Sequence, residues 1–250
     1  MTPPVSTLCS DTAVILAAGR GVRLKELGTQ IPKGFLRLGE RPIVEESIAR
    51  LRRAGVRRLV IVTGHLEQHY RELAARVGGA IELVHNPRYA ESGSMYSLHC
   101  ARDALRGVDF LLLESDLIYE SRALEALAAH AGRNVLLVSG PTASGDEVYV
   151  EARGGKLVNL SKQRAQIAAL FGELVGITRV SPPLFDAMLA SAQARFRDTL
   201  RMEYEQALVA AARSVPVDCL LIPDLVWAEI DDAQHLERAA RQVYPRLSAP

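Results

Sequence analysis

The segment from Ala13 to Leu24 constrains the fold of this chain more than any other part of its sequence. It reads AVILAAGRGVRL, an apolar run that gives way to a loop with two glycines and two arginines. A short, continuously apolar run is typical of a buried parallel strand, and ligands of open α/β sheets bind at the carboxyl ends of such strands. Gly19 and Gly21 allow the backbone to turn sharply and to approach phosphate oxygens closely. The segment therefore predicts a nucleotide site at the first strand of the fold.

Cations near this loop supply the charge that a polyphosphate requires. Arg20, Arg23 and Lys33 can each donate hydrogen bonds to phosphate oxygens. Two other phosphate-binding motifs are excluded, because a dinucleotide fingerprint needs a glycine where Leu24 stands, and the Gly-Lys-Ser/Thr of a Walker loop does not occur in the chain. The alternative is an ordinary strand-to-turn junction whose arginines face solvent.

The same residues carry a resemblance to a known family. The pattern Leu-Ala-Ala-Gly-x-Gly-x-Arg-Leu over residues 16–24, followed by Pro32-Lys33, resembles the signature of nucleotidyltransferases, which join a nucleoside triphosphate to a phosphorylated small molecule and release pyrophosphate. The resemblance extends from about Val14 to Arg241 and implies a Rossmann-like fold. It implies catalytic roles for Arg23 and Lys33. It also implies nucleotide binding by Leu16, Ala17, Ala18, Gly19, Arg20 and Gly21.

Apolar and amphipathic segments alternate along the first half of the chain. The pattern predicts helices over residues 42–54, 67–77 and 94–105 and strands over 59–62, 81–84 and 110–113. Such alternation is typical of an α/β fold with a mostly parallel central sheet and helices on both faces. A chain of 250 residues can bury one substantial core, so we expect a single domain over 1–250 with its core at about 12–245.

The second half has a more mixed pattern. Residues 147–151 and 156–160 flank Arg153-Gly154-Gly155 and predict a small β-hairpin, which we expect to form a lid region over the substrate pocket. The pattern also predicts helices over 182–194, 202–213 and 233–243 and a last strand over 226–230.

Acidic residues follow two of the predicted strands. Asp116 comes just after the strand over 110–113, and Glu229 and Asp231 lie two residues apart, so both point to one face if that segment is extended. A few carboxylates suit Mg²⁺, although an acidic residue before a helix is also common as an N-cap. The resemblance favours the metal role and implies that Asp116, Glu229 and Asp231 hold Mg²⁺. Glu114 is left out of this set, because the chain has Glu-Ser-Asp where some relatives have Asp-x-Asp.

Later motifs are similar to those of one branch, the cytidylyltransferases that act on phosphocholine and 2-aminoethylphosphonate. Residues 86–98 (NPRYAESGSMYSL) resemble the loop that holds the base and ribose, which implies nucleotide contacts for Asn86, Gly93, Ser94 and Ser97. Read without the resemblance, the serines are more typical of helix caps. The elements Leu-Ser-Lys over residues 160–162 and Gly-Glu-x-x-Gly-Ile over residues 172–177 also match the branch. They imply that Lys162 is a catalytic cation at the transferred phosphoryl group.

Composition limits the partners. The net charge is +1, whereas a nucleic-acid-binding protein usually has a strong basic excess. Cys9, Cys100 and Cys219 form no C-x-x-C pair, which is typical of a reducing compartment, and no apolar run approaches the length of about 18 residues that spans a bilayer. We therefore expect a cytoplasmic protein with no nucleic-acid or membrane partner, and we leave a homodimer open.

The resemblance implies a reaction between CTP and a small phosphonate or phosphorylated amine, with Mg²⁺ as the cofactor. A quaternary ammonium favours an aromatic cage, and with only 5% aromatic residues the chain favours a primary amine over choline. Tyr204-Glu205 resembles the branch near the substrate tail, and Asp146, Glu173 or Glu203 could pair with an amine. The alternatives are a sugar-1-phosphate nucleotidyltransferase, a glycosyltransferase that consumes a nucleotide sugar, and a non-catalytic nucleotide-sensing module.

Overall fold

Strand β1 (Thr12–Ala17) runs through the middle of a parallel half-sheet, and all six of its residues are buried, as its apolar sequence predicts. The computed structural model describes residues 10–247. β1 pairs in parallel with β2 (Arg58–Thr63) on one side and with β4 (Phe110–Glu114) on the other. β3 (Ala80–His85) lies parallel to the outer side of β2. The predicted strands of the first half are therefore confirmed.

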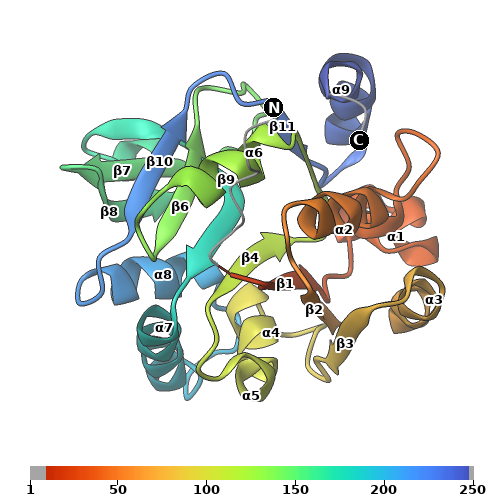
Figure 1. The fold of residues 1–250 in the computed structure, drawn as a ribbon, viewed down its shortest axis with the longest axis horizontal. Helices are drawn as coiled ribbons and strands as arrows, with labels where there is room; N and C mark the ends of the chain where they lie inside the picture. Colours follow the sequence, from red (N-terminus) through yellow and green to blue (C-terminus); the bar gives the residue numbers. More distant parts are fainter. Residues whose placement is uncertain (1–9, 248–250) are drawn as a thin grey trace, which may run out of the picture.

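Helices cover both faces of this half-sheet, also as predicted (Figure 1). Ala13, Ile15 and Ala17 of β1 pack against one group of helices, and Val14 and Leu16 pack against the other, because alternate strand residues point to opposite faces. The first group is α2 (Ile43–Arg53), α3 (Glu67–Val77) and α6 (Arg122–Ala129). The second group is α4 (Ser94–Cys100), α5 (Arg102–Leu105), α7 (Pro182–Arg195) and α8 (Tyr204–Ala212).

The second half of the sheet corrects the expectation of a mostly parallel sheet. Over residues 10–247 the strand order is β3-β2-β1-β4-β9-β6-β10-β8-β7. β9 (Leu170–Val180) runs antiparallel to both β4 and β6 (Val135–Ser139), whereas β10 (Asp218–Ile222) is parallel to β6. β10 also pairs antiparallel with β8 (Lys156–Ser161). The sheet is therefore mixed.

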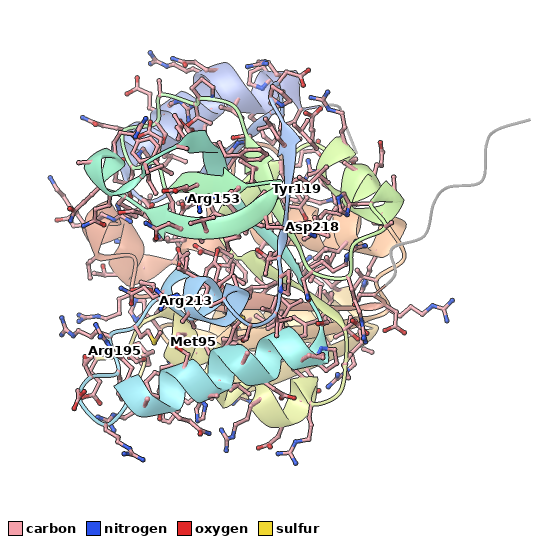
Figure 2. The ribbon with its side chains drawn as sticks, turned by 90° about the vertical axis from the view of Figure 1, so that its left-hand side faces the viewer. Met95, Tyr119, Arg153, Arg195, Arg213 and Asp218 are labelled. Carbon is pink, nitrogen blue, oxygen red and sulfur yellow. The ribbon has the colours of Figure 1, made fainter. Side chains whose placement is uncertain are left out.

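The predicted hairpin is present as β7 (Tyr149–Arg153) and β8, which pair antiparallel. Gly154 and Gly155 join them with φ angles of 56° and 73°, the left-handed conformation that two-residue hairpin turns require. β7 also pairs with β9, so the pairings β9–β6–β10–β8–β7–β9 form a closed circuit. Figure 2 views this half with α8 and α7 stacked beneath the hairpin. The role of the hairpin as a lid stays a prediction.

The C-terminal segment forms a small separate layer above the main sheet. β11 (Trp227–Glu229) pairs antiparallel with β5 (Leu117–Tyr119), which directly follows β4. α9 (Ala233–Arg238) is shorter than predicted and continues as a π-helical turn over Ala239–Val243. This layer packs on the N-terminal segment that contains α1 (Glu26–Gln30), through a core of Leu24, Leu36, Ile43, Ile118, Ala228, Ile230, Ala239 and Val243.

The helices and the cysteines bear on the expected compartment of the protein. Among the helices of residues 10–247, none is long and apolar enough to cross a membrane. Cys100 and Cys219 are free thiols, and Cys9 lies outside the described residues.

Candidate active site

A cleft of about 450 Å³ lies at the carboxyl ends of β1 and β4, where the sequence predicts a nucleotide site. The loop after β1, the segment before α4, the end of β11 and the loop between β6 and β7 contribute to its walls. Most of the predicted site residues line it: Leu16, Ala17, Ala18, Gly19, Arg23, Lys33, Gly93, Ser94, Ser97, Asp116, Lys162, Glu229 and Asp231. Arg20, Gly21 and Asn86 do not line the cleft.

Gly21 shapes the cleft through the turn that follows it. It is buried in the left-handed conformation, with a φ of 61°, and it begins the short 3₁₀ turn Val22–Leu24. That turn presents Arg23 to the cleft, whereas Arg20 is exposed to solvent. The structure therefore brings Arg23 and Lys33 together and leaves Arg20 apart from them.

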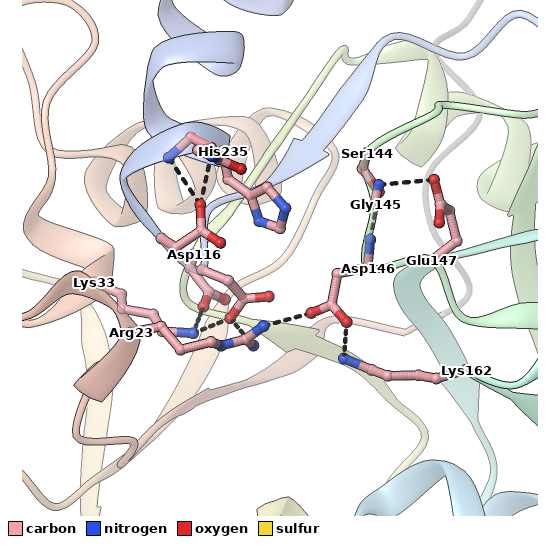
Figure 3. A network of polar contacts seen from close by, with 12 residues as sticks. Arg23, Lys33, Asp116, Ser144, Gly145, Asp146, Glu147, Lys162 and His235 are labelled. Carbon is pink, nitrogen blue, oxygen red and sulfur yellow. Dashed lines mark hydrogen bonds and ion pairs between the residues drawn. The ribbon is translucent and has the colours of Figure 1, made fainter.

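Six charged side chains form a continuous series in which the sign of the charge alternates (Figure 3). The series is Lys162, Asp146, Arg23, Asp231, Lys33 and Asp116. The ion-pair distances are 2.8 Å for Lys162–Asp146, 2.6 Å for Asp146–Arg23, 2.6 Å for Arg23–Asp231 and 2.8 Å for Lys33–Asp116, and Lys33 also pairs with Asp231. Three cations and three carboxylates thus balance one another. A phosphate ligand would compete with these carboxylates for the same donors.

The pairing of β5 with β11 places Asp116 close to the segment that contains Glu229 and Asp231. Glu229 lies opposite Leu117 in the β5–β11 pair. The backbone N–H of Ile230 donates to the carbonyl oxygen of Asp116 at 3.1 Å. The residues after β4 and those at the end of β11 therefore meet at the floor of the cleft.

These segments gather a set of carboxylates that we call the acid cluster: Glu114, Asp116 and Glu229. Each offers an oxygen within 4.8 Å of the others. The cluster contains Glu114, which is not among the predicted metal ligands, although its spacing of two residues from Asp116 at a strand end could have indicated it. Asp231 lies beside the cluster, where its Oδ1 accepts from Lys33 and Arg23.

The cluster fits a hard divalent cation. The Oδ2 atom of Asp231 is buried without a hydrogen-bond partner among the described residues, and an orphaned carboxylate oxygen is costly unless something binds it. Magnesium takes carboxylate oxygens as ligands and keeps water or phosphate oxygens as the rest. The acid cluster, with Asp231 beside it, could therefore hold Mg²⁺.

Burial and neighbouring carboxylates change the pKa values of the acid cluster. Desolvation, together with Asp116 and Asp231 nearby, raises the pKa of Glu229 to about 8, and desolvation beside Glu229 and Asp116 raises the pKa of Glu114. Desolvation alone would lower the pKa of Lys33, but Asp116 and Asp231 outweigh it and raise that pKa well above its usual value. Lys33 is therefore a permanent cation, and the acid cluster favours a positive ligand.

The predicted base loop, residues 86–98, is held by hydrogen bonds within the loop and to the start of α8. Asn86 is fully buried and donates through Nδ2 to Ser92 Oγ and Ser97 Oγ, both at 3.0 Å. Ser94 Oγ donates to Glu203 at 2.6 Å and accepts from the backbone N–H of Tyr204 at 2.8 Å. Asn86 therefore positions the loop from behind. Nucleotide contacts by Ser94 and Ser97, which do line the cleft, stay predictions.

The three acidic residues suggested for an acceptor amine already have other partners. Asp146 bridges Arg23 and Lys162, Glu173 accepts from the backbone N–H and the hydroxyl of Thr142, and Glu203 accepts from Ser94. Glu205 lines the cleft, as Asp146 and Glu203 do, but it differs from them because its buried Oε2 has no hydrogen-bond partner among residues 10–247.

A known family model matches nearly the whole chain. The sequence model of the MobA-like NTP transferase domain matches residues 13–249. The CMP-5′-(3-aminopropyl)phosphonate synthase of Streptomyces rubellomurinus is 37% identical over 131 residues, which cover 52% of this chain and 21% of that protein. The 2-aminoethylphosphonate cytidylyltransferase of Lancefieldella rimae is 30% identical over 164 residues, which cover 64% of each protein. The match therefore spans less than two thirds of either relative.

A solved structure has the same fold over nearly its whole length. The inositol-1-phosphate CTP transferase from T. maritima superposes with a TM-score of 0.79 and covers 96% of this chain and 98% of its own. At 19% identity, this likeness concerns the fold alone.

Proposed function

Because the chain belongs to the MobA-like NTP transferase domain family, we propose that it is a CTP-dependent cytidylyltransferase that joins CMP to a small phosphonate or phosphorylated amine. The observation that carries the proposal is the alternating charge series. It sets Arg23, Lys33 and Lys162 in one cleft next to a carboxylate cluster that suits Mg²⁺. The names of the two relatives, both concerned with aminoalkylphosphonates, support the acceptor class.

The reaction is an in-line displacement at phosphorus. An acceptor phosphonate oxygen forms a bond to the α-phosphorus of CTP, and the bond from that phosphorus to the oxygen bridging to the β-phosphate breaks, which releases pyrophosphate. The attacking oxygen is already anionic near neutral pH, so no general base is needed. Arg23, Lys33 and Lys162 stabilise the negative charge that develops on the phosphoryl oxygens and the leaving group. Mg²⁺ held by the acid cluster, with Asp231, would neutralise phosphate charge when bound.

The cleft favours a primary ammonium over a quaternary one. Tyr96, Tyr119, Tyr204 and Trp227 are the aromatic candidates for such a cage. Tyr119 is fully buried and bonded to Ser47, and Tyr96 packs on Phe196. Tyr204 and Trp227 alone of these four line the cleft, and Tyr204 is 1% exposed. Tyr70 and Tyr89 also line the cleft, and Tyr70 is fully buried, so Tyr89 and Trp227 are the partly exposed aromatic residues of its wall. Carboxylates are more numerous than aromatic side chains in the same wall, which favours charge pairing with a primary ammonium.

Glu205 supplies what an ammonium requires. Its Oε2 atom is buried in the cleft without a hydrogen-bond partner among the described residues, and desolvation raises the pKa of this carboxyl to about 7. A cation beside it would restore the charged form and satisfy the free oxygen. We assign Glu205 to the ammonium of the acceptor.

Pyrophosphate release with Mg²⁺ tests the function, with CTP, UTP, dTTP and GTP crossed against 2-aminoethylphosphonate, phosphocholine, inositol-1-phosphate and glucose-1-phosphate. We expect turnover with CTP and 2-aminoethylphosphonate. Turnover with a sugar phosphate alone would move the protein to the sugar nucleotidyltransferases, and no release with any pair would contradict the proposal.

The Glu205→Gln variant tests the acceptor assignment. It should raise the KM for 2-aminoethylphosphonate by about tenfold, since a hydrogen bond to a charged group contributes roughly 1.5–3 kcal/mol. It should leave the KM for ethylphosphonate, which has no amine, unchanged. Equal effects on the two acceptors would show that Glu205 does not hold the amine.

A further inference from the structure

Asp146 joins two cations that come from distant parts of the chain. It lies in the loop between β6 and β7, and its Oδ2 accepts from Arg23 at 2.6 Å while its Oδ1 accepts from Lys162 at 2.8 Å (Figure 3). Arg23 belongs to the loop after β1, and Lys162 directly follows β8. One carboxylate therefore links both sides of the cleft mouth.

The loop that carries Asp146 is anchored independently of these cations. Thr142 donates to Glu173 of β9 through its backbone N–H at 2.8 Å and its hydroxyl at 2.7 Å. Arg238 of α9 donates to the carbonyl oxygen of Thr142 at 2.7 Å, and Gly145 N–H donates to Glu147 at 2.9 Å. The position of Asp146 is thus set by the fold, and the two long side chains are placed against it.

Metal binding does not explain this carboxylate. Asp146 is outside the acid cluster, and both of its oxygens are bound to cations. A carboxylate next to a polyphosphate site repels the substrate, so its presence calls for a compensating role. Arg23 and Lys162 are 47% and 54% exposed, and side chains of this length lose about 2 kcal/mol of rotamer entropy when they are fixed.

We propose that Asp146 is a positioning residue that fixes Arg23 and Lys162 toward the transferred phosphoryl group, an inference that rests on the proposed function. Each cation keeps donors for phosphate, because guanidinium has five N–H groups and ammonium has three. Asp146 thereby orders Lys162, and together with Asp231 it orders Arg23, before the substrate binds. The entropy of these side chains is then already lost when the reaction begins.

The test compares Asp146→Asn with Asp146→Glu in the full chain. Asparagine keeps the shape of the side chain but has one neutral acceptor oxygen, so it cannot hold both cations by charged hydrogen bonds. We expect kcat to fall on the order of tenfold to a hundredfold, which is the usual cost of slightly misplaced catalytic groups. The KM for CTP should change much less, because removal of a negative charge offsets the looser cations. The glutamate keeps the charge and should recover part of the lost kcat.

Asp109→Asn is the matched control. The side chain of Asp109 is 31% exposed, against 24% for Asp146. Its two oxygens accept hydrogen bonds from Arg133 at 2.7 and 2.8 Å, and it does not line the cleft. This variant should keep the kcat of the parent protein. An unchanged or higher kcat in Asp146→Asn, or no recovery with glutamate, would overturn the positioning role.

A second measurement separates this inference from the proposed function. Lys25, Lys33, Lys156 and Lys162 are the lysines of the chain, so ¹³C-methylation gives few NMR signals. The pH titration of the Lys162 signal should move toward lower pH in Asp146→Asn and stay unchanged in Asp109→Asn. An unmoved signal would overturn the inference even in an active enzyme. If the parent protein releases no pyrophosphate with any acceptor, the proposed function fails, while this titration still reports whether Asp146 holds Lys162.

Discussion

Lys33 is the residue at which the cations and carboxylates of the cleft meet. Its side chain is 19% exposed and pairs with Asp116 and Asp231, which are almost completely buried. The ammonium therefore neutralises two carboxylates and is also placed where it can bind a phosphate oxygen. Removal of one partner from a buried ion pair leaves an uncompensated charge, which typically costs about 3–5 kcal/mol.

Lys33→Met should accordingly affect both stability and turnover. In chelator, we expect the free energy of unfolding to fall by about 3 kcal/mol, and Mg²⁺ should recover part of this loss because it can replace the missing charge. The kcat should fall about a hundredfold or more, the usual cost of losing one preorganised charge. Urea unfolding with and without Mg²⁺ and pyrophosphate release give the two quantities. Lys156→Met, which removes a 55% exposed partner of Asp218, is the control and should change neither.

The sequence predicted these site residues where chemistry and strand position coincide. Arg23 lies in the loop after one buried strand and Asp116 directly after another, so one α/β rule places both at one crevice. Lys33 lies far beyond β1 in the sequence and was predicted from the Pro32-Lys33 motif. The pairing of Asp231 with Lys33, and the position of Glu229 beside Glu114 and Asp116, depend on how β5 pairs with β11 across the fold. No local pattern in the sequence encodes that pairing.

At the scale of elements, Ser94 joins two helix N-termini. It is the first residue of α4, and its hydroxyl bonds both the carboxylate of Glu203 and the backbone N–H of Tyr204, where α8 begins. Glu203 also forms a capping box with Gln206. The base loop and the residues proposed for the acceptor are therefore held by one set of hydrogen bonds.

Ser94→Ala should lower the free energy of unfolding by about 1–2 kcal/mol, the usual value of a lost helix cap. If Ser94 also contacts the nucleotide, the KM for CTP should rise as well, whereas a purely capping role predicts a stability change alone. Urea unfolding and steady-state kinetics measure the two effects. Ser214→Ala, which removes a hydroxyl bonded only to the carbonyl of Ala211 at 3.1 Å within the described residues, shows what an ordinary local bond contributes.

The apolar runs of the first half predicted β1, β2 and β4, whereas three strands of the second half, β6, β9 and β10, were not predicted. β1, β2 and β4 are buried on both faces and read as unbroken apolar runs. β9 reads LFGELVGITRV, and its two glycines and its buried Glu173 disfavour a strand in isolation. The strand forms because β4, β6 and β7 all pair with it, so its antiparallel direction is fixed by tertiary contacts that periodicity cannot express.

At the scale of the whole molecule, β9 connects the two halves of the sheet. Its C-terminal part pairs with β4 of the parallel half, and its N-terminal part closes the circuit through β7. The cleft likewise draws Arg23 and Asp116 from one half and Asp146 and Lys162 from the other. Neither half has a complete sheet or a complete site without the other.

This continuity supports the expectation of one domain, and unfolding can test it. Trp227 is the single tryptophan, lies in the layer above the main sheet and donates to Ser139 at the end of β6, so its fluorescence reports the junction of the two halves. Far-UV circular dichroism reports the helices and strands of the whole chain. If the halves unfold together, the urea transitions by the two probes should share a midpoint and a slope, which is the test of a cooperative unit. Trp227→Phe, followed by circular dichroism alone, checks that the probe does not itself shift the transition. Separate midpoints would mean that the halves unfold independently, and the chain would then contain two cooperative units with the active site between them.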